Sequence, residues 1–131
     1  METQKPTFVQ ALKGGVIAGA IAAALNLVWN FIAQSMGSEP PPNFQMGVIM
    51  ASIFPLLIGA IFFFLLTKFT AKGKMIFLII SGVFTLLSLF GTMQPTMPDG
   101  TATPEGFMFL AMPMHLIAGG MAMWAIPRFS K

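Results

Sequence analysis

The chain has 131 residues, of which 56% are hydrophobic and only 8% carry a charge at neutral pH. This leaves too little polar surface to cover a water-soluble globule, and the net charge of +3 is accounted for by membrane topology, so we infer no nucleic-acid partner. Because there is no cysteine, the chain can form no disulfide, thiol nucleophile or Cys-ligated metal centre.

Four uncharged apolar runs reach the roughly 20 residues that a helix needs to cross about 30 Å of hydrocarbon. The runs therefore predict an all-α integral membrane protein with one domain over residues 1–131. Its spans are predicted at approximately 14–36, 46–67, 75–93 and 106–126. The connections are short, so we expect an up-down-up-down bundle of four transmembrane helices.

The charged residues divide between the two sides of these runs. Lysine and arginine occur only before the first run, between the second and third, and after the fourth. The other two connections, 37–45 and 94–105, hold three of the four acidic residues. Basic residues concentrate in cytoplasmic loops, so both termini are predicted to be cytoplasmic.

The first span carries a stripe of small residues that becomes polar at mid-membrane. Its members recur at steps of three or four and so share one helical face: Gly15, Gly19, Ala23, Asn26 and Asn30, with Gln34 one step further. Helices in lipid pack through small residues and interhelical hydrogen bonds. We therefore expect this stripe to face the bundle interior.

The second and third spans differ in character. In the second, Phe62, Phe63 and Phe64 are suited to contact with lipid or with another chain. The third carries hydroxyl groups at helical spacing, including Thr85 and Ser88. These hydroxyls are predicted either to face the interior or to bond the carbonyl four residues earlier in their own helix.

The fourth span contains His115, the only side chain within the spans that titrates near neutrality. An ionisable group inside a membrane is a functional-site hypothesis by default. The alternative is a neutral imidazole that bonds Asn26, Asn30 or Thr85 across the bundle. Pro113, two residues earlier, cannot donate to the carbonyl of Phe109 and should bend the helix locally.

Depth groups these polar residues together. Those near the centres of their spans or toward the external side are predicted to line a ligand pocket open outward: Asn26, Asn30, Thr85, Ser88 and His115. Small residues in the cytoplasmic half of the bundle are predicted to pack tightly and to close this pocket on that side. The alternative is that the same groups only bond one another or the backbone, as helix-packing contacts.

Methionine supplies a different hypothesis. Met108, Met112 and His115 stand at i, i+4 and i+7 of the fourth span, and thioether with imidazole is a soft ligand set that suits Cu(I). Methionine also fills cores in apolar sequences. We expect no cofactor otherwise and keep Cu(I) as an alternative.

The sequence gives no support to enzymatic activity. It has no Ser-His-acid set, no paired carboxylates within the spans and no Gly-rich phosphate loop. We therefore predict a non-enzymatic protein of the lipid bilayer, either an accessory subunit of a membrane-protein partner or a ligand-binding bundle. The alternative is a homo-oligomeric transporter or channel for a metal ion or small neutral solute, since one bundle is too thin for a wide pore.

Two segments carry a family resemblance. Residues 14–37, with Asn26-Leu27-Val28-Trp29-Asn30, and residues 114–120, which begin Met114-His115, resemble a group of uncharacterised small four-span bacterial membrane proteins. The last span of that group has a similar Met-His followed by small residues. The resemblance implies a four-helix bundle in a bacterial inner membrane, and it implies no known activity.

Overall fold

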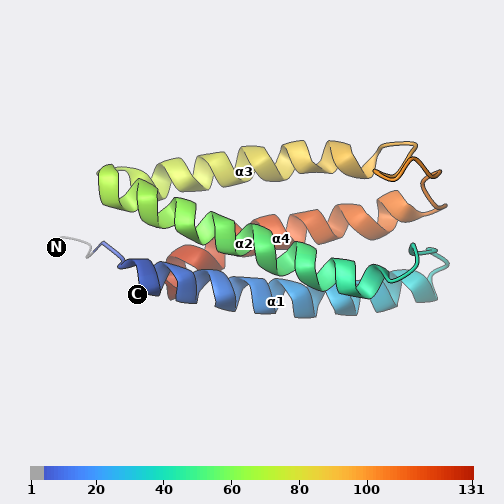
Figure 1. Cartoon of the computed structure of the whole chain (residues 1–131), viewed down its shortest axis with the longest axis horizontal. Coiled ribbons are helices and arrows are strands. Elements are labelled where there is room, and N and C mark those ends of the chain that lie inside the picture. Colours follow the sequence, from blue (N-terminus) through green and yellow to red (C-terminus); the bar gives the residue numbers. More distant parts are fainter. Residues whose placement is uncertain (1–4) are drawn as a thin grey trace.

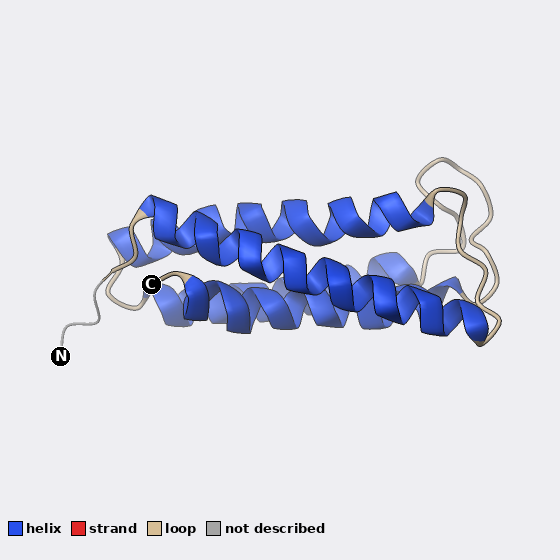
Figure 2. Cartoon of the chain, turned by 90° about the horizontal axis from the view of Figure 1, so that it is seen from below, coloured by secondary structure: helices blue, strands red, loops and turns tan. Residues whose placement is uncertain are grey.

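The computed structural model describes residues 5–131, which form four helices joined by loops at the two ends of the molecule (Figures 1 and 2). The helices are α1 (Phe8–Ser35), α2 (Phe44–Phe69), α3 (Gly73–Thr92) and α4 (Phe107–Phe129). All four are long and apolar enough to cross a membrane, and even α3, with 20 residues, extends about 30 Å. The predicted all-α, multi-pass membrane architecture is confirmed at this level.

At the basic residues, the helices extend beyond the predicted apolar runs. Helix α1 begins at Phe8 because Thr7 forms a capping box with Gln10: the Gln10 backbone N–H donates to Thr7 Oγ1 at 3.2 Å, and the Thr7 N–H donates to Gln10 Oε1 at 2.8 Å. Helices α2 and α4 run through Lys68 and Arg128 near their C-terminal ends. A charged residue ends a hydrophobic run, whereas the helix continues through it at the membrane surface.

Successive helices run in opposite directions, so the described N-terminal segment and the C-terminus lie at the same end (Figure 1). Lys5 Nζ donates to the Lys68 carbonyl at 3.2 Å, and Lys13 Nζ donates to the Lys131 carbonyl at 2.6 Å. Helix α1 packs against α2 and α4, and α3 packs against α4 and α2. Over their full lengths α1 and α3 make no close backbone contact, so they lie at diagonally opposite corners of the bundle.

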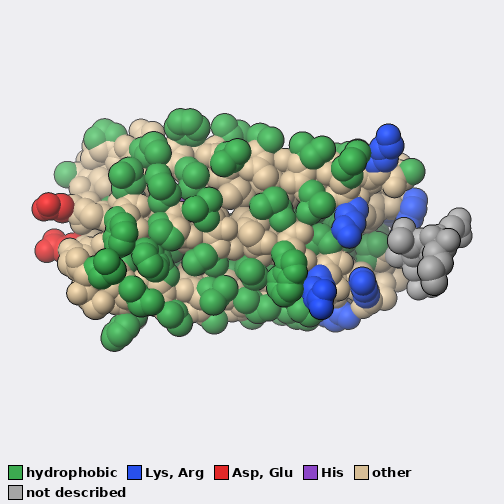
Figure 3. All heavy atoms as spheres, turned by 180° about the vertical axis from the view of Figure 1, so that it is seen from behind, with side chains coloured by type: hydrophobic (Ala, Val, Ile, Leu, Met, Phe, Trp, Pro, Cys, Tyr) green, Lys and Arg blue, Asp and Glu red, His purple; other side chains and the backbone are tan. Residues whose placement is uncertain are grey.

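Charge separates the two ends of the bundle (Figure 3). We call the end that carries the described lysines and the arginine the basic end, and the end formed by the loops 36–43 and 93–106 the acidic end. Apolar side chains cover the length between them on the face shown. In the second loop, the hydroxyl and backbone N–H of Thr101 donate to the Asp99 carboxylate and lower the pKa of Asp99.

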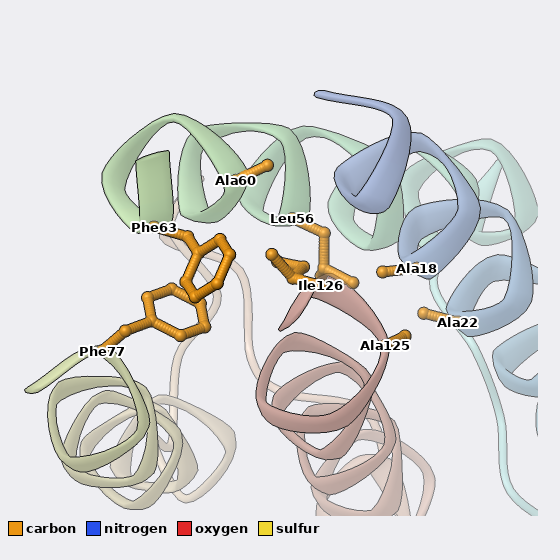
Figure 4. Packing of buried hydrophobic residues seen from close by; sticks show 8 residues of the cluster. All are labelled: Ala18, Ala22, Leu56, Ala60, Phe63, Phe77, Ala125 and Ile126. Carbon is orange, nitrogen blue, oxygen red and sulfur yellow. The ribbon is translucent and has the colours of Figure 1, made fainter. Parts of the chain in front are cut away.

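A tightly packed apolar core lies nearer the basic end (Figure 4). Phe63 of α2 meets Phe77 of α3 edge to face, with ring centroids 5.0 Å apart. Helix α1 approaches α2 through glycine: a Cβ added at Gly15 would lie 2.6 Å from Ala60 Cβ, and one at Gly19 would lie 3.1 Å from Ile53 Cα. The two backbones can be this close only because those side chains are absent.

The prediction that all three phenylalanines of α2 face lipid is wrong for Phe63, which is 4% exposed. Phe62 is 43% exposed, and Phe64 packs against Phe8 with ring centroids 5.4 Å apart. Adjacent helical residues are about 100° apart around the axis, so three in a row cannot share one face. Phe63 lies one turn beyond the buried Ala60, on the interior side of α2.

Candidate polar site between the helices

The predicted interior stripe of α1 is confirmed from Gly15 to Asn30: these five members are all buried, and Asn26 and Asn30 are only 3% and 2% exposed. The prediction is wrong for Gln34, which is exposed. The small residues of the stripe, nearest the basic end, allow α2 to approach α1 closely. The two asparagines come next along α1, toward the acidic end. The same close packing that stabilises the bundle therefore encloses two carboxamide groups.

Asn26 joins α1 to α2 by a chain of hydrogen bonds. Its Nδ2 donates to Ser52 Oγ at 2.9 Å, and the Ser52 hydroxyl donates to the Val48 carbonyl at 2.7 Å. Among the residues that the structure describes, neither Asn26 Oδ1 nor Asn30 Oδ1 has a hydrogen-bond partner. A buried acceptor without a donor costs about 1–3 kcal/mol, so these two oxygens are the strongest indication of a site.

Helix α4 completes the surroundings of Asn30. Trp29 donates from Nε1 to the Leu110 carbonyl at 2.9 Å, and its ring packs against Phe109 with centroids 5.4 Å apart. Pro113 follows in α4, and a helical proline loosens the preceding turn, where the carbonyl that Trp29 uses is located. A second apolar cluster holds the three helices together here: Ala33, Val48, Leu110 and Met114.

The predicted hydroxyl groups lie on a different interface. Thr85 donates to the Ser81 carbonyl four residues earlier, as the alternative interpretation predicted, whereas Ser88 donates to the Thr85 carbonyl three residues earlier, each at 2.7 Å. Thr85 packs so closely on Gly119 of α4 that an added Cβ there would overlap its side chain. The asparagines of α1 and the hydroxyls of α3 therefore lie on diagonal helices, and the structure does not bring all five predicted residues together.

His115 is half-buried in α4, and its Nδ1 lies 2.9 Å from the Ala111 carbonyl oxygen of the same helix. Within residues 5–131, no hydrogen bond joins it to Asn26, Asn30 or Thr85 as the cross-bundle hypothesis expected. Helical side chains lean back over the preceding turn, which makes that carbonyl the nearest acceptor. A carbonyl can only accept, so Nδ1 carries a proton, and in the tautomer with no second proton Nε2 is an acceptor or metal ligand.

The three predicted copper ligands lie along α4, and the first of them is the most exposed. Met108 is 51% exposed, whereas Met112 and His115 are half-buried. Nothing in the arrangement tests metal binding, and the Cu(I) site stays a prediction.

A surface hollow of about 340 Å³ lies at the acidic end, where α1 ends and α4 begins. Two of its lining residues are joined by a hydrogen bond, in which the Ser38 hydroxyl donates to the Gly106 carbonyl at 3.5 Å. Phe109 forms part of its wall and also contacts Trp29, the residue next to Asn30. The full lining is Met36, Gly37, Ser38, Glu39, Glu105, Gly106 and Phe109.

Comparison with known proteins bears on nearly the whole chain. Residues 6–131 match the model of a family of unknown function, DUF6069. The chain belongs to the DUF6069 family. No curated protein and no solved structure gives a significant match. The family membership confirms the predicted resemblance to small four-span proteins and brings no activity to transfer.

The chemistry of this DUF6069 protein must therefore be inferred from its own residues. Two buried carboxamide oxygens, one helical turn apart, can accept hydrogen bonds from one molecule that carries two donors. Ser52 and Trp29, which position this part of α1, were not among the predicted site residues. Their signal in the sequence is weak, because serine and tryptophan are also common at membrane-helix contacts and interfaces.

Proposed function

We propose that this protein is a non-enzymatic, small-ligand-binding bundle whose site takes a hydrogen-bond donor at Asn26 and Asn30. The observation that carries the proposal is the pair of buried Oδ1 atoms, which have no partner within residues 5–131. Bound donor groups, such as the N–H or O–H of a small polar molecule, would remove the free-energy cost of both. The Ser52 hydroxyl does not serve as this donor, because it already donates to the Val48 carbonyl.

The proposed setting is a bacterial inner membrane, crossed in up-down-up-down order with both termini in the cytoplasm. The charge separation between the ends supports this orientation, because basic residues concentrate on the cytoplasmic side. In this orientation the acidic end is external. The asparagines lie in the half of α1 that leads to it, so the ligand enters from outside.

The hollow at the acidic end is the proposed entrance. Glu39 and Glu105 in its lining favour a neutral or cationic molecule over an anion. Phe109 separates the hollow from Trp29, and movement of these two rings would open a path toward Asn30.

Transport by a homo-oligomer is the second candidate, and one observation favours it. The hydrogen bond of Nδ1 to Ala111 leaves His115 Nε2 free to bind, and metal-ligating histidines commonly donate their other nitrogen to a carbonyl in this way. With Met108 and Met112 it would form a Cu(I) site on α4. An accessory subunit, which would retain a partner chain, is the remaining possibility.

Native mass spectrometry of protein extracted gently from its own membrane tests these proposals together. The samples are the wild-type chain, Asn30→Leu, and Gln34→Leu as a control that makes the same polarity change at an exposed position of α1. We expect a small molecule bound at one copy per chain in the wild type and in Gln34→Leu. It should be absent from Asn30→Leu, which removes one of its two acceptors.

Other results of the same experiment would contradict the proposal, each in a different way. A wild-type chain without any small molecule contradicts ligand binding, as does a molecule that Asn30→Leu retains. Copper that is lost on His115→Ala would replace the proposal by metal transport. A stoichiometric second protein, with no small molecule on this chain, would replace it by an accessory role.

A further inference from the structure

A second surface hollow, of about 430 Å³, lies at the basic end against the start of α3. It is far along the bundle from the asparagines and shares none of their residues. Its lining combines two cations with apolar side chains: Ala71, Lys72, Lys74, Met75 and Leu78. A hollow with this composition fits a molecule that has both an anionic group and a hydrocarbon tail.

The two lysines are available to a ligand. In the described part of the chain, neither the Lys72 nor the Lys74 side chain has a hydrogen-bond, ion-pair or aromatic partner, and both are exposed. Neighbouring cations are engaged: Lys68 Nζ lies 5.4 Å from the ring centroids of both Phe64 and Phe69. Arg128 lies 5.5 Å from the Trp124 ring centroid.

The depth of the lining residues matches a lipid. Lys72 and Lys74 flank the first residue of α3, at the level where a membrane span begins. Leu78 lies four residues beyond Lys74, or about 6 Å further along the helix axis, on the hydrocarbon side. Met75 is half-exposed between them, so the hollow runs from the headgroup level into the acyl region.

We infer that this hollow binds one anionic phospholipid, with the phosphate between Lys72 and Lys74 and an acyl chain along Met75 and Leu78. The inference rests on the cationic rim and the apolar floor together, because surface lysines alone would attract any anionic surface equally. It is independent of the proposed function at Asn26 and Asn30. The bound lipid would hold the α2–α3 connection at a fixed depth in the membrane.

The test uses purified full-length protein and native mass spectrometry with phosphatidylglycerol or phosphatidylcholine of identical chains. Each lysine near anionic lipid contributes roughly fivefold in affinity, so Lys72→Gln with Lys74→Gln should weaken phosphatidylglycerol binding about 30-fold. The control, Lys5→Gln with Lys131→Gln, removes the same charge at the same end and should change it less than about threefold. Both lysines of the hollow are exposed, so unchanged thermal melting verifies the fold.

Two further measurements distinguish a lipid from a free anion as the ligand of the hollow. Met75→Ser with Leu78→Ser should weaken phosphatidylglycerol binding while all lysines remain, and inorganic phosphate at the same concentration should not compete. Equal losses in the two lysine pairs, equal affinity for the two lipids, or competition by inorganic phosphate would each overturn the inference.

Discussion

Helices α1 and α3 lie on opposite corners of the bundle and differ in which residues they bury. The buried face of α1 consists of glycine, alanine and asparagine, ten residues in all, whereas α3 buries only Gly73, Phe77 and Thr92. Most other large side chains of α3 are exposed, and Phe84 is 73% exposed. In lipid, a large apolar side chain gains little by burial, so the more closely packed position goes to the helix whose small residues permit close approach.

The largest effect should come from filling the α1 interface. Gly15→Leu would place a side chain where even a Cβ lies 2.6 Å from Ala60 Cβ and 3.0 Å from the Leu56 carbonyl oxygen. We expect it to lower the free energy of unfolding by about 3 kcal/mol, measured by denaturant titration in mixed micelles. The matched change on the other helix, Gly91→Leu, meets no atom within 4 Å and should leave stability within about 0.5 kcal/mol. Equal effects at the two glycines would remove the distinction between the helices.

A smaller effect is expected where α3 does enter the core. Phe77→Ala removes the edge-to-face contact with Phe63 and leaves a cavity. It should cost about 2 kcal/mol by the same titration, less than the roughly 3–5 kcal/mol seen in water-soluble cores, because burial from lipid adds little. The control is Phe84→Ala, which deletes the same ring from the exposed face of α3 and should change stability by less than about 0.5 kcal/mol. A larger loss for Phe84→Ala would show that a covered surface, rather than lipid, surrounds that face.

The smallest effect has the opposite sign. In protein stripped of bound small molecules, Asn30→Leu removes a buried acceptor that lacks a donor within residues 5–131, so it should raise stability by about 1 kcal/mol. Gln34→Leu, at an exposed position of the same helix, should be close to neutral. A marked loss of stability in Asn30→Leu would mean that Asn30 is a structural contact between helices.

The fold and the face of α1 follow from the sequence because both depend on patterns within one segment. Hydrophobic length marks each span, and the spacing from Gly15 to Asn30 fixes one side of one helix. Which residues of two helices contact each other cannot be predicted in this way, since it depends on how each helix is rotated and on which helices are neighbours. For this reason Asn26 meets Ser52 rather than Thr85, and Thr85 meets Gly119.

Local competition explains the other differences between expectation and structure. His115 bonds Ala111 because a carbonyl one turn earlier is nearer than any group across the bundle. Phe63 turns inward because its neighbours occupy the outward directions. The spacing of residues within α4 does not reveal the choice of His115, whereas the position of Phe63 one turn beyond Ala60 does place it on the interior side of α2.

The central claim is that Asn30 Oδ1 accepts a hydrogen bond from a bound small molecule, and isotope-edited infrared spectroscopy tests it directly. The chain has three asparagines, at positions 26, 30 and 43, so the difference between labelled wild type and labelled Asn30→Leu isolates the Asn30 side-chain carbonyl. The account predicts a lowered, hydrogen-bonded stretching frequency in protein as extracted, which rises to the free value after the small molecule is washed out. A free-carbonyl frequency from the start, or one that washing does not change, would contradict it.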